Sequence, residues 1–136
     1  MNYQSLQEAL ATSALSLGYT PTHRNSLHKT LCESGFPIAS IDSPVLLHTE
    51  GERERENLFS VCVNFMCANE LSDEARAAVI SRMAAEVEQF VSLLRGANDV
   101  LSVEVQESLV QQQSLTIAGE VALTLKATLR CIDCNH

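Results

Sequence analysis

Residues 115–131 read LTIAGEVALTLKATLRC, and apolar and polar side chains alternate through them almost without a break. Successive side chains of a β-strand point to opposite faces of the sheet, so this alternation predicts a strand with one buried face and one wet face. Strands usually span about five or six residues, and we therefore expect this one to bend or bulge near Gly119. The face predicted to be buried carries Leu115, Ile117, Val121, Leu123, Leu125, Ala127, Leu129 and Cys131.

Two other segments show the same alternation. Residues 101–106 alternate Leu, Val and Val with Ser, Glu and Gln, and residues 59–67 gather their aromatic and β-branched side chains on one face. A further strand is predicted to begin near Val45. The charged, glycine-containing segment 49–56 then predicts the tip of a β-hairpin between that strand and residues 59–67. Strands that alternate in this way are typical of antiparallel sheets with one solvated face.

Two helices are predicted from apolar residues that recur every three or four positions. The first spans about residues 3–17, with Asn2 as its N-cap and Gly18 at the left-handed position that follows a helix. The second begins after the cap Ser72 and ends at Gly96. Its apolar face consists of Val79, Ile80, Met83, Val87, Phe90, Val91 and Leu94.

Residues 22–45 are less regular. The weak alternation of residues 22–32 predicts an edge strand, and the segment that contains Gly35, Pro37 and Pro44 predicts an irregular crossing before the next strand. The predicted order of elements is therefore α-β-β-β-α-β-β.

This order indicates a single α+β domain over residues 1–136. We expect a two-layer structure in which a mainly antiparallel sheet carries the two amphipathic helices on one face. Residues 49–56 form its charged hairpin tip, and residues 132–136 are expected to be a frayed tail because chain ends are usually poorly ordered.

The composition is globular and argues against several partners. Hydrophobic residues make up 46% of the chain and charged residues 19%. The net charge of −8 opposes binding to nucleic acid, because such binding depends on cations that neutralise phosphates. The longest apolar runs fall well short of the roughly 18 residues of a membrane span, and the polar N-terminal segment is unlike a signal peptide. We therefore expect neither sequence-specific nucleic-acid binding, nor a membrane partner, nor secretion.

The five cysteines indicate free thiols in a reducing compartment. Cys131, Cys134 and His136 form the most suggestive group, because a CxxC pair and a histidine are zinc-ligand types. A closed zinc site needs about four ligands, and Cys62 and Cys67 are predicted to face opposite sides of one strand. We therefore expect no metal and no cofactor.

Catalytic motifs are absent from the sequence. It has no GxSxG elbow, no phosphate-binding glycine loop and no HExxH pair. Arg82 and Glu86 have the spacing of an i,i+4 ion pair, which we place on the exposed side of the second helix. We predict that the protein is not an enzyme and has no catalytic or cofactor-binding residues.

The charged hairpin tip has two interpretations. It is either a solvated hairpin end or an arm that contacts a neighbouring subunit through Glu52, Arg53, Glu54 and Arg55. Mixed charge suits the second interpretation, because such a tip fixes the register of a contact more than its affinity. The polar faces of the long strands are likewise either wet surface or a subunit interface.

These features together resemble the tail terminator and tail-completion (neck) proteins of long-tailed bacteriophages. The resemblance covers nearly the whole chain. It lies in the opening helix that ends at Gly18, residues 36–44 (FPIASIDSP) before a charged hairpin, the strand 59–67, the capped helix from Ser72, and the terminal alternating strand.

The resemblance implies a small α+β subunit that assembles into a homo-oligomeric ring, commonly a hexamer. Such a ring caps the finished tail tube and docks to the head connector, as part of a virion assembled in the host cytoplasm. The net charge of −8 would suit a ring whose lumen passes DNA without gripping it. Fold similarity does not fix function. The alternative that the elements allow is a soluble α+β module that binds a small ligand or serves regulation, with a concave apolar pocket.

Overall fold

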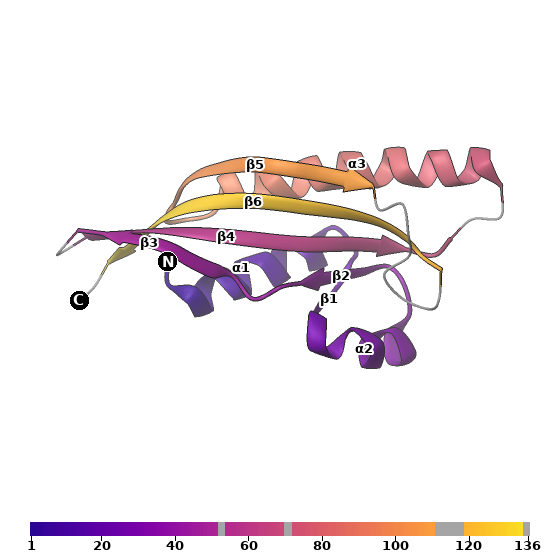
Figure 1. Cartoon of the computed structure of the whole chain (residues 1–136), viewed down its shortest axis with the longest axis horizontal. Coiled ribbons are helices and arrows are strands. Elements are labelled where there is room, and N and C mark those ends of the chain that lie inside the picture. Colours follow the sequence, from indigo (N-terminus) through magenta and orange to yellow (C-terminus); the bar gives the residue numbers. More distant parts are fainter. Residues whose placement is uncertain (52–53, 70–71, 111–118, 135–136) are drawn as a thin grey trace.

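The computed structural model describes residues 1–51, 54–69, 72–110 and 119–134, and the side chains of Glu54 and Cys134 also fall outside the described part. Within these residues the chain has the predicted α+β fold, with three α-helices and a mixed sheet of six strands (Figure 1). In chain order the elements are α1 (Tyr3–Ser16), β1 (Thr20–His23), the 3₁₀ helix η1 (Arg24–Ser26), α2 (Leu27–Ser34), β2 (Ile38–Ile41), β3 (Val45–Glu50), β4 (Glu54–Cys67), α3 (Asp73–Arg95), β5 (Val100–Val110) and β6 (Val121–Cys134).

Both predicted helices form, and capping sets their ends. The Asn2 side chain accepts a hydrogen bond from the Ser5 backbone N–H, and the Ser5 hydroxyl accepts one from the Asn2 backbone N–H, each at 2.9 Å. This reciprocal pair satisfies two donors that a helix start leaves free. Gly18 follows α1 with a φ of +89°, which glycine adopts without strain. Ser72 caps α3 by accepting from the Ala75 backbone N–H at 3.1 Å.

Helices α1 and α3 cover the same face of the sheet. The apolar face predicted for α3 is confirmed, with Val79 and Ile80 half-buried at its start and the later residues buried. On β4, the Phe65 ring makes edge-to-face contacts with Tyr19 and Phe90, at centroid distances of 5.2 and 5.1 Å. Each large side chain buried here contributes about 1.5–3 kcal/mol. The buried helical residues in this core are Leu6, Leu10, Ala14, Met83, Val87, Phe90, Val91 and Leu94.

The sheet is built around the long antiparallel pair β4 and β6. The two strands pair over their whole described length, from Glu54 opposite Cys134 to Cys67 opposite Val121. The strand order is β1-β2-β4-β6-β5, and β3 pairs with β4 further along the edge that β2 occupies. Only β1 and β2 are parallel among the described strands, so the prediction of a mainly antiparallel sheet is confirmed.

The edge strand predicted over residues 22–32 is wrong. Only Thr22 and His23 belong to a strand, and the chain then forms η1 and α2. Leu27 and Leu31 are one helical turn apart, and the weak alternation in this segment concealed that pair. The irregular crossing predicted after it also contains a strand, β2, in which all four residues are buried.

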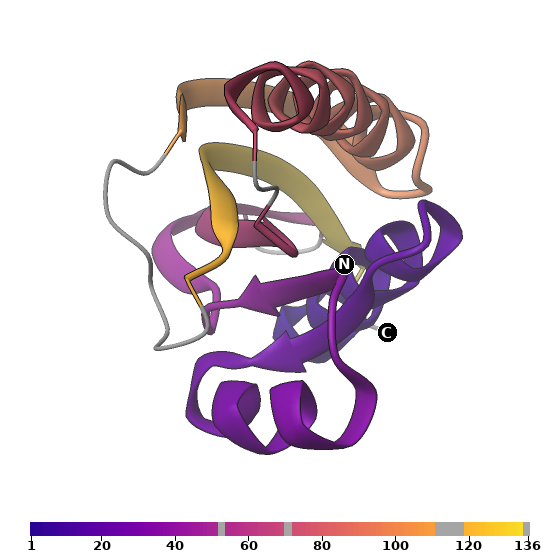
Figure 2. The same cartoon turned by 90° about the vertical axis from the view of Figure 1, so that its right-hand side faces the viewer.

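Helix α2 covers the face of the sheet opposite to α1 and α3, as Figure 2 shows. Leu27, Leu31 and Phe36 pack there against a second, small core. Its buried members are Ile38, Met66 and Ala122. Because both faces are covered at this end, residues 121–125 of β6 are all buried although their sequence alternates between larger and smaller side chains.

The frayed tail predicted for residues 132–136 is wrong for residues 132–134. These residues continue β6 opposite residues 54–56 of β4, and the Met1 ammonium group donates a hydrogen bond to the Ile132 carbonyl. Residues 135–136 lie outside the described part, as do residues 115–118 of the predicted long strand. Gly119, with a φ of +72°, precedes β6 near the predicted bend.

Candidate assembly surface

β3 and the first part of β4 form the predicted hairpin, which extends beyond α1 and α3 at one end of the molecule (Figure 1). Pro44 is buried just before β3, and Gly51 leaves it with a φ of +94°. Pairing runs from Val45 opposite Ser60 to Glu50 opposite Glu56. β3 together with residues 54–60 of β4 is termed the arm below.

The arm presents apolar side chains to solvent. All six residues of β3 are exposed, and Val45, Leu46 and Leu47 retain 56%, 52% and 53% of their accessible surface. Among the described strands β3 pairs only with β4, so its outer edge is open. An open edge with exposed aliphatic side chains is a ready template for another strand. The sequence predicts this strand, but not that its apolar residues are left uncovered.

The structure describes the predicted contact residues only in part. Arg55 is exposed and lies opposite Asp133 of β6. Glu54 belongs to β4, with its side chain outside the described part, and Glu52 and Arg53 also fall outside it. The contact of these four residues with a neighbouring subunit stays a prediction.

Opposed carboxylates on the arm are each matched by a basic side chain. Glu50 and Glu56 lie directly opposite each other, an arrangement that is unfavourable for like charges. His48 Nε2 lies 2.9 Å from Glu50 Oε1, and Arg130 Nη1 lies 3.8 Å from Glu56 Oε1. Such exposed pairs contribute about 0–1 kcal/mol, so they shape the charge pattern more than the stability. The spacing of two along a strand puts His48 and Glu50 on one face, a signal in the sequence that the prediction missed.

The opposite edge of the sheet is β5, which also pairs with a single strand, β6, among the described residues. It carries the acidic residues Glu104 and Glu107, and Glu107 Oε2 lies 3.5 Å from Lys126 Nζ on β6. Its large apolar side chains that are 40–51% exposed are Leu101, Val105 and Leu109. The sheet therefore has two open edges with exposed aliphatic side chains, one at β3 and one at β5.

A polar cluster closes the core near the other end of β4. The Arg82–Glu86 pair forms, with Arg82 Nε 3.3 Å from Glu86 Oε1. Its predicted position on the exposed side is wrong for Glu86, which is half-buried and accepts a hydrogen bond from the Tyr19 hydroxyl at 3.1 Å. Arg82 also donates to the Cys67 sulfur at 3.4 Å. Burial, with Cys67 and Glu86 nearby, raises the pKa of Tyr19, so its hydroxyl stays protonated and can donate.

A hollow of about 380 Å³ opens beside this cluster. Cys67 is 5% exposed at its wall. The hollow combines a thiol, a guanidinium and a carboxylate with apolar groups, a mixture that can contact a small polar molecule. Its other lining residues are Leu17, Phe36, Pro37, Ala68 and Val79.

Two further cysteines have thiols that favour the protonated form. Burial raises the pKa of Cys62, with a further contribution from Asp42, and burial raises the pKa of Cys131 to about 11. Because the thiolate is the reactive species, neither side chain is an activated nucleophile at neutral pH. As predicted, Cys62 and Cys67 face opposite sides of β4, since only Cys67 belongs to the main core.

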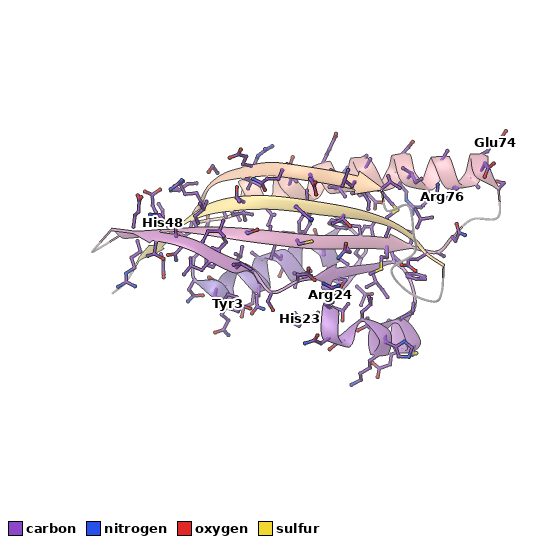
Figure 3. All side chains as sticks on the ribbon, viewed as in Figure 1. Tyr3, His23, Arg24, His48, Glu74 and Arg76 are labelled. Atoms are coloured by element: carbon purple, nitrogen blue, oxygen red, sulfur yellow. The ribbon has the colours of Figure 1, made fainter. Side chains whose placement is uncertain are left out.

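Within the described ranges, no three His, Cys, Asp or Glu side chains gather in a way that could hold a metal ion. Of the terminal CxxC group, the Cys134 side chain and His136 lie outside those ranges. His23 lies beside η1 and His48 lies on the arm, far apart on the molecule (Figure 3). None of the helices that the described residues form is both long and apolar enough to cross a membrane.

The fold defines the class of protein: an α+β protein with a mixed six-stranded sheet, two helices on one face and a short helix on the other. The sequence matches no protein-family model, and no curated protein matches it significantly. The resemblance to phage tail terminator and neck proteins therefore stays a prediction from the sequence.

Proposed function

We propose that the protein is a structural subunit of a phage or prophage tail, which assembles with copies of itself into a ring. In this role the ring caps the tail tube and docks to the head connector, as tail terminator and neck proteins do. The observation that carries the proposal is the arm, where three consecutive aliphatic residues, 45–47, stay more than half exposed on an open strand edge. Another strand that paired with this edge would cover these side chains.

The charge distribution supports the same role. The arm carries both signs of charge, and complementary rim charges set the register of an interface. The overall charge of −8 would repel DNA from the lumen of a ring, which suits a channel that DNA must leave freely.

The direct test of assembly is the mass of the protein in solution. Light scattering on the purified chain at rising concentration should show a species several times heavier than the 14.9 kDa monomer. Electron micrographs of tail tubes from the phage that encodes the chain, mixed with the protein, should show rings at the tube ends. A monomer at every concentration, with bare tube ends, would contradict the proposal.

The arm's charges can be tested separately from the fold. Replacing Arg53 and Arg55 with Glu should weaken assembly, because it leaves the hairpin tip uniformly acidic. The melting temperature should stay nearly unchanged, since an exposed charge contributes little to stability. Arg76→Glu, on the first turns of α3, is a charge-reversal control away from the tip and should leave assembly intact. If Arg53→Glu and Arg55→Glu lower assembly and melting temperature together, the tip is a structural element and not an interface.

A second candidate function is a ligand-binding module, which the hollow beside Tyr19 favours. Its volume of about 380 Å³ lies within the range of about 300–1,000 Å³ that is usual for small-molecule sites, and it combines apolar walls with Arg82 and Glu86. A thermal-shift screen against metabolites separates the two candidates. A ligand that raises the melting temperature of the wild-type protein but not of Arg82→Ala would favour the module, and a structural ring subunit should respond to none.

A further inference from the structure

The open edges at β3 and β5 form the two opposite sides of one four-stranded region. Along the arm the strand order is β3-β4-β6-β5, so β3 forms one edge and β5 the other. One row of directly paired residues that crosses all four strands consists of Leu46, Phe59, Leu129 and Val103. A second row begins at Thr49 and ends at Val100. The open edges of β3 and β5 are therefore level with each other along the strands.

The strand directions also match. Each neighbouring pair in this region is antiparallel, so β3 and β5 run in opposite directions. If a second copy is added by rotation about an axis roughly along the strands, its β3 arrives beside β5 of the first copy and antiparallel to it. Because the edges are level, this contact needs no displacement along the axis. A head-to-tail contact without such a displacement is compatible with a closed ring, whereas one with a displacement climbs into a filament.

The exposed side chains make the two edges suitable partners. Residues 45–47 on β3 and Leu101 and Val105 on β5 occupy the same stretch of the sheet, so pairing would cover aliphatic groups on both edges. Both edge strands are bulged, β3 after Leu46 and β5 after Val100 and again after Val105. Bulges increase the local twist and are common where sheets curve into closed structures.

Charge disfavours pairing of β5 with itself. β5 carries Glu104 and Glu107 and no Lys or Arg of its own, and Lys126 of β6 lies beside Glu107, so two copies of β5 would bring four carboxylates and two lysines together. Like charges on neighbouring strands are destabilising. On β3, Glu50 is already paired with His48, and residues 45–47 carry no charge. The acidic edge of β5 is therefore better suited to pair with the largely uncharged edge of β3 than with a second β5.

We infer that the open edge of β3 in one copy of the chain pairs antiparallel with the open edge of β5 in the next copy, so that one sheet continues from subunit to subunit. This inference rests on the self-assembly in the proposed function and names the two surfaces that carry it. The occupant of each open edge is thus a second copy of this chain.

A complementation experiment tests it. One variant combines Leu46→Lys with Leu47→Lys and blocks β3, and another combines Leu101→Lys with Val105→Lys and blocks β5. All four side chains are exposed, so both variants should keep the wild-type circular dichroism and melting temperature. Milder Ser substitutions at the same positions serve if a Lys pair unfolds the chain. The matched control combines Leu15→Lys with Leu93→Lys, at exposed positions on α1 and α3.

Head-to-tail pairing predicts that each blocked variant alone is a monomer of 14.9 kDa by light scattering, while the control keeps the wild-type mass. An equimolar mixture of the two blocked variants retains one intact β3 and one intact β5, so it should form a dimer and nothing larger. Recovery of the dimer on mixing would also demonstrate that both variants are folded.

Each other outcome overturns the inference in a distinct way. If only the β3 variant is monomeric, two β3 edges pair with each other. If both variants are monomeric and the mixture stays so, the two edges are not partners. If both keep the wild-type mass, assembly uses another surface and the proposed function survives without the inference. A wild-type chain that is itself monomeric at all concentrations contradicts the inference and the proposed function alike.

Discussion

β3 and β4 are hydrogen-bonded neighbours, yet their apolar side chains have opposite surroundings. Leu46 of β3 and Phe59 of β4 are directly paired and point to the same face of the sheet. Phe59 is 2% exposed and Leu46 is 52% exposed. Both side chains are large and apolar, so residue type does not explain the contrast. The two positions differ in what packs over them, because the core beneath α1 and α3 includes Phe59 of β4 but does not extend to β3.

The contrast separates two uses of hydrophobic surface. On β4 the apolar face is satisfied within the chain, where the Phe65 ring contacts Tyr19 and Phe90. On β3 comparable residues lie on an open edge, where burial requires a partner. Substitutions on β4 should therefore act on the free energy of unfolding, and substitutions on β3 should act on assembly.

The largest expected effect is that of Phe65→Ala. Removing a buried aromatic ring leaves a cavity between two other rings and should lower the free energy of unfolding by about 3–5 kcal/mol. Urea denaturation in dilute solution measures this loss. A loss below about 1 kcal/mol would indicate that the inner face of β4 is far less tightly packed than the structure has it.

Met66→Ala tests the next residue along the strand, on the opposite face. Met66 is fully buried beneath α2, and its truncation should cost about 2–5 kcal/mol. The control is Leu58→Ala, on the same outer face of β4 but at the arm end and only half-buried, where the cost should be clearly smaller. Equal costs at the two positions would remove the distinction between a covered end of the sheet and an open one.

A pH titration tests whether the core reaches the level of the arm. Cys131 lies in the same row as Thr49 of β3 but is fully buried, and burial raises the pKa of its thiol from 9.0 to about 11. Between these two pKa values the folded chain keeps a proton that the unfolded chain loses. The contribution of the protonated thiol to the free energy of unfolding is therefore complete below pH 9 and is lost as the pH rises towards 11.

In this pH window the free energy of unfolding should fall by up to about 1.4 kcal/mol per pH unit. Urea denaturation at several pH values measures it, and Cys131→Ala should show a shallower slope than the wild type. The pKa of Tyr19 is also raised, so Tyr19 lowers the free energy of unfolding of both proteins at higher pH. Identical slopes would place the Cys131 thiol in contact with water.

The smallest effect on folding is expected for Leu46→Ala. The side chain is already half in water, so the free energy of unfolding of the monomer should change by less than about 0.5 kcal/mol. Dilute-solution denaturation checks this value against Phe65→Ala in the same strand pair. A loss above about 2 kcal/mol would mean that the arm is covered within its own chain.

Much of this architecture could be predicted from periodicity. The caps Asn2 and Ser72 locate the starts of α1 and α3, and the alternation in residues 59–67 locates the inner face of β4. The prediction failed over residues 22–32, where a short helix has only Leu27 and Leu31 as its apolar signal. It also failed at residues 132–134, since pairing with a distant segment of β4 holds that end of the chain.

The candidate surface was less predictable than the fold. Residues 49–56 stand out by their charge, and the sequence therefore directs attention to Arg53 and Arg55. Exposure of Leu46 has no such signature, because an uncovered aliphatic residue and a buried one look the same in a sequence. Tyr19 and Glu86 likewise meet only through the packing of the α1 end against α3.

Local patterning alone fixed the α+β class, the ends of α1 and α3 and the inward faces of β4 and β6, because capping and periodicity act over a few neighbouring residues. Which apolar residues are covered, which strand edges stay open and that these edges lie level followed from the folded chain alone. Those properties depend on segments far apart in the sequence, and no short-range pattern records where such segments meet.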